Sequence, residues 1–162
     1  MASVVSNTGP LIALADIGQL GLLRPLFATT LIPPAVRAEV LKEPALSALQ
    51  TAILEGWILE QHPHDTGAIR LLNETLDLGE SEVIALAQQV DPKWIILDDL
   101  AARHIAEAMG MAVIGTLGVL LQAKDAGHVA RVKPLLDTLR EQSLYISDKL
   151  YTQILKSADE VS

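Results

Sequence analysis

Polar side chains that could bind a cation follow two short apolar runs in the sequence. Asn7 and Thr8 come directly after the first run, and Asp98 and Asp99 come directly after a later one. Any one of them could cap a helix, because helix N-termini favour Asn, Asp and Thr. A single cap cannot use two carboxylates, and neighbouring like charges repel. The aspartate pair therefore indicates a divalent cation, with an ion pair to Arg103 or one Asp turned to solvent as the alternatives.

A glutamate on the apolar side of a helix is a further candidate ligand. The pattern over residues 79–90 predicts a helix with one apolar face, which includes Ile84. Glu80 lies on that face, whereas Glu82 lies on the opposite, solvent side. Burying a carboxylate is costly unless it is paired, hydrogen-bonded or bound to metal. The dipole of the first helical turn also favours an acidic residue, so Glu80 has two explanations.

Two further segments carry polar side chains of interest. Glu39 borders the apolar stripe of a helix predicted over residues 35–42, and it turns either toward the sheet edge or into solvent. Thr116, after Gly115, opens a later helix and is expected to be its N-cap. Oxygen ligands from four segments suit a hard cation such as Mg²⁺ or Mn²⁺, bound mostly by carboxylates and water. The four residues are Asn7, Glu39, Glu80 and Asp99.

Short apolar runs alternate with helical patterns along the chain, and this alternation indicates the fold class. Strands are predicted over residues 3–6, 29–32, 57–60, 94–97 and 112–114. Helices are predicted over 20–27, 35–42, 45–55, 65–75, 79–90, 116–126, 132–141 and 147–157, with one more starting at Thr8 and one ending at Met109. Continuous apolar strands separated by helices indicate an α/β fold with a parallel sheet covered on both faces. Sites in such sheets lie beyond the carboxyl ends of the strands, near a topological switch point.

The composition bounds the number of domains and the class of partner. A chain of 162 residues with 50% hydrophobic residues suits one domain with a substantial core. The net charge of −8 argues against a broad basic surface for nucleic acid. The absence of cysteine excludes disulfides and thiolate catalysis, and an aromatic content of 3% is too low for a stacking platform.

The two ends of the sequence bear on localisation and partners. Residues 1–15 are apolar but lack the positive start of a signal peptide, and no run in the chain approaches about 20 apolar residues. We therefore expect a cytoplasmic protein that makes no membrane contact. Near the other end, an apolar stripe between Tyr145 and Leu155 is assigned to the core, with a dimer or partner surface as the alternative.

The order and spacing of these residues resemble the PIN-domain nuclease family over nearly the whole chain. The features that match in order are the strand ending in Asn7-Thr8, Glu39 after a Pro pair, Glu80 before an Ile-Ala-Leu-Ala run, and the pair Asp98-Asp99. Two further segments are similar to a largely uncharacterised prokaryotic group of PIN-like proteins. These are the run from Val113 to Leu120 and the segment from Ser147 to Tyr151.

The resemblance implies a three-layer α/β/α sandwich with a central, mainly parallel sheet. It implies one PIN-like domain over residues 1–162, in which 131–162 form a C-terminal helical extension. The implied activity is hydrolysis of RNA with Mg²⁺ or Mn²⁺, in which the metal activates a water and offsets charge on the phosphate. Many relatives are VapC-type toxins, so a small antitoxin protein and a homodimer are the expected partners beside RNA.

The resemblance also assigns roles to individual positions. The implied catalytic residues are Asn7, Glu39, Glu80 and Asp99, the candidate metal ligands are Asn7, Glu80, Asp98 and Asp99, and Thr8 and Thr116 support them. Arg37, Lys42 and Arg103 lie near the mouth of the predicted site, where they could supply local positive charge.

This sequence departs from the family pattern at two of these positions. Asn7 replaces a carboxylate, and Ala101 stands where relatives often carry a further acid, so the charge that would hold a divalent ion is reduced. The alternative function is therefore a catalytically weak or inactive PIN scaffold that acts through protein–protein binding. A phosphate-accepting receiver domain fits less well, because receivers carry their acid pair after the first strand.

Overall fold

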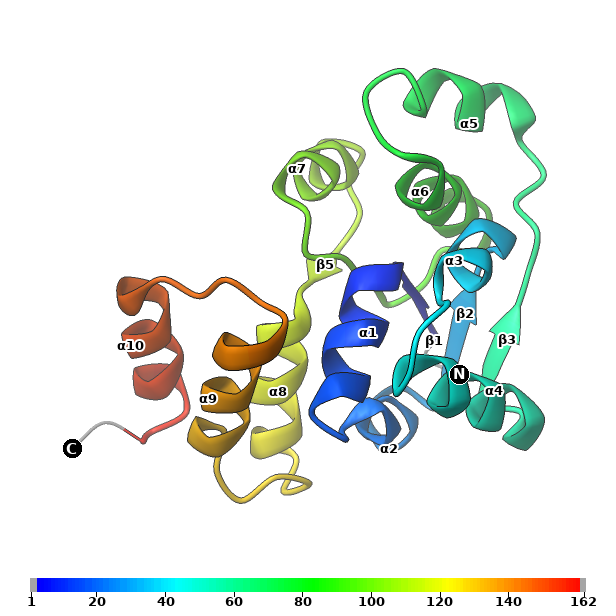
Figure 1. The fold of residues 1–162 in the computed structure, drawn as a ribbon. Coiled ribbons are helices and arrows are strands. Elements are labelled where there is room, and N and C mark those ends of the chain that lie inside the picture. The colour runs from blue at the N-terminus through cyan, green and yellow to red at the C-terminus, as the bar shows by residue number, and fades with distance from the viewer. Residues whose placement is uncertain (1–2, 161–162) are drawn as a thin grey trace.

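The computed structural model describes residues 3–160, and its centre is a five-stranded sheet (Figure 1). The strands are β1 (Ser3–Ser6), β2 (Thr29–Ile32), β3 (Ile58–Glu60), β4 (Trp94–Ile96) and β5 (Val113–Ile114). They lie in the order β3-β2-β1-β4-β5, and every neighbouring pair is parallel, as predicted. The chain leaves β1 toward β2 and later returns to β4 on the other side of β1. The switch point of the sheet therefore lies between β1 and β4.

Helices cover both faces of this sheet and complete a three-layer α/β/α sandwich. They are α1 (Thr8–Asp16), α2 (Leu23–Phe27), α3 (Pro34–Glu39), α4 (Ala45–Glu55), α5 (Thr66–Leu72), α6 (Leu78–Val90), α7 (Leu100–Ala108), α8 (Thr116–Asp125), α9 (Lys133–Gln142) and α10 (Asp148–Ser157). In Figure 1, α5, α6 and α7 lie above the strands, α1 lies beside β1, and α2, α4 and α8 lie lower in the view. The predicted fold class is thereby confirmed.

The core is apolar on both sides of the sheet because each side faces a helical layer. Val4 and Val5 of β1 and Ile96 of β4 are fully buried, and Phe27 at the end of α2 is the largest of the fully buried side chains. Only an α/β sheet covered twice needs such uninterrupted apolar strands. The polar residues that follow such an apolar strand lie at the edge of the sheet, where its carboxyl end emerges.

The helix predicted over residues 35–42 is shorter in the structure and ends at Glu39. Val40 has an extended backbone, with ψ of 94°, and leads into a link before α4. The extended backbone of Val40 ends the helix, and Pro44 further along disfavours a helical backbone at Glu43. Glu39 is consequently the last helical residue of α3.

The end of the described chain is fixed to α8 and α9 by one buried carboxylate. Glu160, whose side chain is 5% exposed, pairs with Lys124 Nζ at 2.8 Å and accepts from the amides of Val132 at 2.7 Å and Lys133 at 3.0 Å. Burial alone would raise the pKa of Glu160, but these hydrogen bonds hold it below its usual value. Residues 1, 2, 161 and 162 of the predicted domain lie outside the described residues.

Within residues 3–160, no individual helix has the length and apolar character to cross a membrane. One pair, Thr8–Asp16 with Leu20–Phe27, passes that test jointly, but the two members meet at a bend of 116°. Leu11, Leu14 and Leu23 of this pair are buried in the core.

Candidate active site

The carboxyl ends of β1 and β4 lie side by side, as the parallel-sheet prediction requires. Ser6 is paired with Ile96, and the Asn7 amide donates to the Ile96 carbonyl at 3.0 Å. Asn7 and the aspartates that follow β4 are therefore carried on adjacent backbone segments. This edge is also the switch point of the sheet, where α/β folds place their ligands.

Asn7 occupies the N-cap position of α1 without acting as a cap. Its backbone is extended, and its half-buried side chain makes no capping hydrogen bond within the described residues. The ordinary explanation for an Asn at this position is therefore absent. Its amide oxygen remains available to a ligand at the edge of the sheet.

The two aspartates after β4 serve the N-termini of two different helices. Asp99 Oδ2 accepts from the amide of Ala102 at 3.0 Å and caps α7. Asp98 Oδ1 accepts from the amide of Thr116 at 2.8 Å, and its Oδ2 accepts from the Thr116 hydroxyl at 2.6 Å. The pair therefore has a structural explanation that needs no cation. Asp99 Oδ1 makes no hydrogen bond to the part of the chain described, whereas both Asp98 oxygens are occupied.

One expectation for this loop, and one of the alternatives to a cation, are wrong. Thr116 is not the N-cap of α8, because Gly115 holds that position and Asp98, from a distant segment, accepts the first amide. Arg103 makes no ion pair with Asp99 within residues 3–160. Its Nη1 instead donates to the Leu97 carbonyl at 3.0 Å, which fixes the backbone just before the aspartates.

Glu80 is buried, as its place on the helix predicts, with an exposed fraction of 8%. Its Oε1 accepts from the Asp77 amide at 3.1 Å, and its own amide donates to Asp77 Oδ1 at 2.8 Å. This reciprocal capping box starts α6. Burial raises the pKa of Glu80, and the nearby charges of Asp77 and Asp99 raise it further. Asp77 was not among the predicted residues, although the spacing of an Asp three residues before a Glu could have indicated it.

Glu39 is an exposed residue, and its carboxylate lies against the start of α6. Thr8 Oγ1 donates to Glu39 Oε2 at 3.3 Å. A Cβ added at Gly79 would lie 2.2 Å from Glu39 Oε1, so only glycine lets the carboxylate sit there. Removal of this carboxylate from water raises the pKa of Glu39, and Asp77 raises it further, against the opposing effect of the Thr8 hydrogen bond.

The position of Glu82 on the helix predicts a solvent-facing side chain, and this prediction is wrong. Glu82 is half-buried, and its Oε1 accepts from the amide of Ala35 at 3.0 Å. This contact fixes the first turn of α3 against α6. Since Glu39 is the last residue of α3, Glu82 helps to hold Glu39 beside Gly79 at the start of α6.

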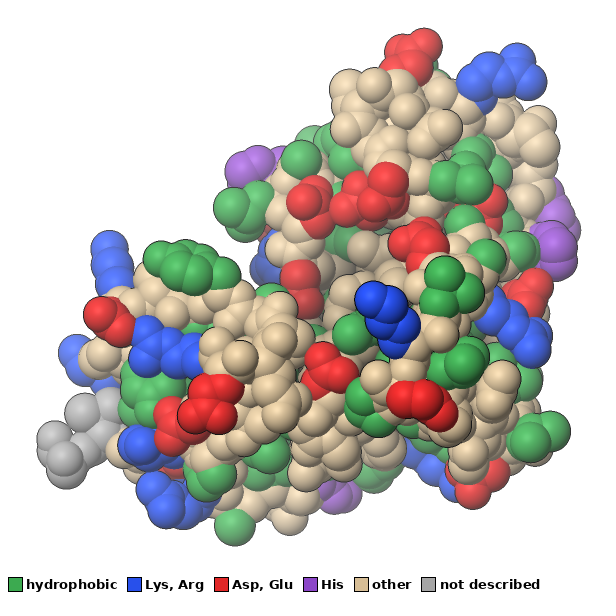
Figure 2. Space-filling view, viewed as in Figure 1, with side chains coloured by type: hydrophobic (Ala, Val, Ile, Leu, Met, Phe, Trp, Pro, Cys, Tyr) green, Lys and Arg blue, Asp and Glu red, His purple; other side chains and the backbone are tan. Residues whose placement is uncertain are grey.

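The site is strongly acidic and has little basic compensation. None of the ion pairs found in residues 3–160 includes Glu39, Asp77, Glu80 or Asp99. Arg37, predicted near the mouth, pairs with Glu60 at 2.9 Å instead. In Figure 2, acidic side chains gather on the viewed face over α7, α6 and α3.

The donor set matches a hard cation in its chemistry. Every candidate ligand supplies oxygen, and mutual repulsion already raises the pKa of the Glu80 carboxyl. No group of three or more His, Asp or Glu side chains in the described residues is arranged to hold a metal. Mg²⁺ usually retains several waters and binds through one or two carboxylates, and the residues present fit that mode.

Comparison with known families decides what this arrangement belongs to. A family model described as a PIN domain matches residues 3–160. The chain belongs to the PIN-domain family. No curated protein matches the sequence. Membership indicates a nuclease-type function in general.

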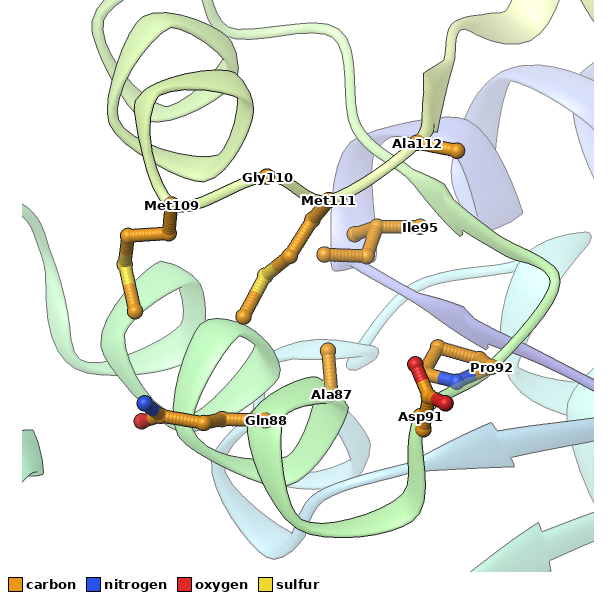
Figure 3. Close-up of a pocket in the computed structure, with 9 residues that line it drawn as sticks. All are labelled: Ala87, Gln88, Asp91, Pro92, Ile95, Met109, Gly110, Met111 and Ala112. Atoms are coloured by element: carbon orange, nitrogen blue, oxygen red, sulfur yellow. The ribbon is translucent and has the colours of Figure 1, made fainter.

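A hollow in this PIN domain lies near the amino ends of β4 and β5, away from the carboxyl ends that carry the candidate site. Figure 3 shows Met109 and Met111 extending into it from the turn after α7, toward Ala87 and Gln88 on α6. Asp91 is the one ionisable residue among those that line it. The hollow lacks the oxygen-rich character of the edge that carries Asn7 and Asp99.

Replacing Gly79 by Ala tests whether the space for Glu39 matters. The new methyl group would displace the Glu39 carboxylate, so we expect Mn²⁺ affinity of the PIN domain to fall by about 10-fold. Thermal stability should not fall, because Ala is the better helix former. Titration calorimetry measures the affinity.

Gly67→Ala is the matched control, because its Cβ would meet Asp65 Oδ1 at an ordinary 3.5 Å. Equal Mn²⁺ affinity in Gly79→Ala and Gly67→Ala would show that the position of Glu39 has no bearing on metal binding.

The raised pKa of Glu39 predicts how stability depends on pH. Above the ordinary value of 4.5, the folded state keeps a proton that the unfolded chain has released, so the free energy of unfolding falls as pH rises through this window. Glu39→Gln cannot lose that proton and keeps an acceptor for Thr8. We expect the variant to gain stability relative to wild type as the pH rises above 4.5 in metal-free urea denaturation. A stability difference between Glu39→Gln and wild type that does not change with pH would contradict a raised pKa of Glu39.

Proposed function

We propose that this PIN domain is a divalent-metal-dependent ribonuclease that hydrolyses RNA phosphodiesters with Mg²⁺ or Mn²⁺. The observation that carries the proposal is a set of carboxylates that have no basic partner in the described residues. Beside them lies the side-chain amide of Asn7, which caps no helix there. Buried or crowded carboxylates of this kind are stabilised by a cation. Their place at the switch point of the sheet leaves them open to a substrate.

Each residue of the site is assigned one role. Asn7, Glu80 and Asp99 would hold the cation through their oxygens. When bound, the cation supplies an activated water and offsets the charge that develops on the phosphate. Glu39, whose pKa is raised, would serve as the group that takes up or releases a proton, and Thr8 keeps its carboxylate oriented.

Asp98 and Thr116 support the site from a further distance. Both oxygens of Asp98 bind Thr116, so we assign Asp98 a positioning role in place of metal ligation. The contact joins the loop after β4 to the start of α8. It thereby fixes the backbone on which Asp99 is carried.

We further propose that the protein is the toxin of a toxin–antitoxin pair in the cytoplasm, restrained by a small antitoxin and active as a homodimer. The resemblance to VapC-type members of the family supports this role. Expression alone is expected to arrest bacterial growth, and co-expression of the small adjacent gene product is expected to restore it. Growth that stays normal while the purified protein cleaves RNA would separate the toxin role from the activity.

The activity itself is tested with purified protein and a mixed-sequence RNA. We expect cleavage with Mn²⁺ or Mg²⁺ and none with excess chelator, measured by gel electrophoresis of end-labelled RNA. Cleavage that persists in chelator would overturn the metal-dependent mechanism.

A catalytically weak scaffold is the second candidate function. Asn7 brings no charge to the site, and the described residues contain no three-acid group ready for a metal, which favours weak binding. This function predicts no measurable Mn²⁺ binding at millimolar concentration and no RNA cleavage by the wild-type protein.

A further inference from the structure

A largely apolar groove lies beside the edge strand β5, between α7, α8 and α10. Its volume is about 650 Å³. Val113 and Ile114 of β5 form its floor, and Leu117 and Leu121 of α8 form one wall. The C-terminal stripe that the sequence assigned to the core is divided here: Ile154 and Leu155 are buried, but Leu150 is 36% exposed.

This groove runs into the candidate active site. Asp98 and Leu100 both line it, and they flank Asp99 in the chain. Gly115 lies at the junction, where an added Cβ would come within 2.7 Å of Arg103 Nη1 and 2.8 Å of Asp98 Oδ1. The backbone at residue 115 therefore passes close to both side chains, and the groove and the carboxylates share one boundary.

The polar groups of the groove are few and specific. Arg103 is the one basic residue that lines it, and its guanidinium donates only to the Leu97 carbonyl within residues 3–160. Tyr145, on the rim, is 90% exposed, which is unusual for a ring of this size. Trp94 lines the far end, and its buried Nε1 has no hydrogen-bond partner in the described chain.

We propose that this groove binds one nucleobase of RNA, next to the phosphodiester held at the carboxylates; the inference rests on the proposed ribonuclease function. The apolar walls accept the faces of a base, and Tyr145 offers a ring for stacking. Arg103 lies at the junction, where a strand that enters the site carries its next phosphate. A single exposed ring makes one base subsite and not an extended platform, in agreement with the low aromatic content.

The position of Arg103 favours RNA over a protein segment as the occupant. A guanidinium with unused donors between an apolar groove and an acidic site matches a ligand that alternates flat apolar rings with negative charge. A purely apolar peptide would leave those donors without partners. The subsite therefore selects for a base beside the scissile phosphate.

The test measures cleavage kinetics on a short RNA and on the same RNA with one abasic nucleotide beside the cleaved bond. Tyr145→Ala is expected to raise KM by about fivefold or more, with kcat nearly unchanged. The abasic substrate should raise KM of the wild type similarly but add little to Tyr145→Ala, because both changes remove the same contact. Tyr145→Phe should restore the wild-type KM. Leu54→Ala, an 87% exposed apolar residue on α4, is the matched control.

The results separate this inference from the activity on which it rests. Cleavage by the wild type with an unchanged KM in Tyr145→Ala overturns the base subsite and leaves the ribonuclease intact. If Tyr145→Ala has an unchanged KM and changes from dimer to monomer, the groove is assigned to a protein interface. This result also overturns the base subsite. If the wild type cleaves no RNA, the ribonuclease fails. RNA binding by fluorescence anisotropy then decides the subsite, which is overturned if Tyr145→Ala binds as tightly as the wild type.

Discussion

Replacing Glu80 by Gln is expected to lower kcat/KM for RNA cleavage by at least about 100-fold while the fold persists. The change removes the charge of a buried carboxyl that faces Asp99 across the sheet edge. A Gln at the third helical position still accepts from the Asp77 amide, so the capping box is kept. The variant therefore separates the charge of Glu80 from its part in starting α6.

The measurement compares initial cleavage rates with saturating Mn²⁺, beside thermal unfolding followed by circular dichroism. Glu107→Gln, an exposed position on α7, is the matched control and should retain full activity. Glu80→Gln that cleaves RNA at the wild-type rate would remove Glu80 from the site. Loss of activity with an unfolded circular dichroism spectrum would instead assign Glu80 a purely structural role.

Replacing Asn7 by Asp is expected to increase Mn²⁺ affinity by about 10-fold or more, because it adds a charged ligand of the same shape. The Asn7 side chain makes no capping bond within the described residues, so the exchange breaks no contact there. The new charge lies beside acids whose repulsion already raises the pKa of Glu80. Metal-free Asn7→Asp should therefore be less stable than the wild type, and the metal-bound form more stable.

Calorimetric titration with Mn²⁺, and melting temperatures with and without Mn²⁺, check both parts of this prediction. Asn73→Asp, an exposed change of the same kind at the end of α5, controls for the added charge and should leave affinity unchanged. If the wild type binds Mn²⁺ as tightly as Asn7→Asp, the amide is already an adequate ligand. If neither protein binds Mn²⁺ at millimolar concentration, the scaffold function is favoured over the ribonuclease.

The sequence was sufficient to predict the parallel sheet and the proximity of the polar residues that follow β1 and β4. Uninterrupted apolar runs such as Val4-Val5 and Ile95-Ile96 can be buried only in a sheet covered on both faces. Once the strands are parallel, the residue after β1 and the residues after β4 must lie at one edge. The burial of Glu80 followed from helical periodicity alone, since its neighbours on that face are apolar.

Some partners of the site residues were not predictable, because they come from distant segments. Asp98 binds Thr116, eighteen positions later, and Glu82 binds the amide of Ala35, far earlier in the chain. Local rules assign each helix a cap from its own sequence, whereas these helix starts are capped by another segment. Glu82 was misplaced for this reason: the helical wheel gives its direction but not the presence of α3 in that direction.

The first turn of α6 has a consequence for any mutational survey of this protein. Asp77 starts the helix, Gly79 leaves room for a carboxylate from another helix, and Glu80 combines a cap with a charge. Truncating Glu80 removes its cap and its charge together, so an alanine scan would report a single loss of activity with two indistinguishable origins. Only an isosteric substitution such as Glu80→Gln separates these two origins. In related sequences, we expect residues 77, 79 and 80 to change together and not one at a time.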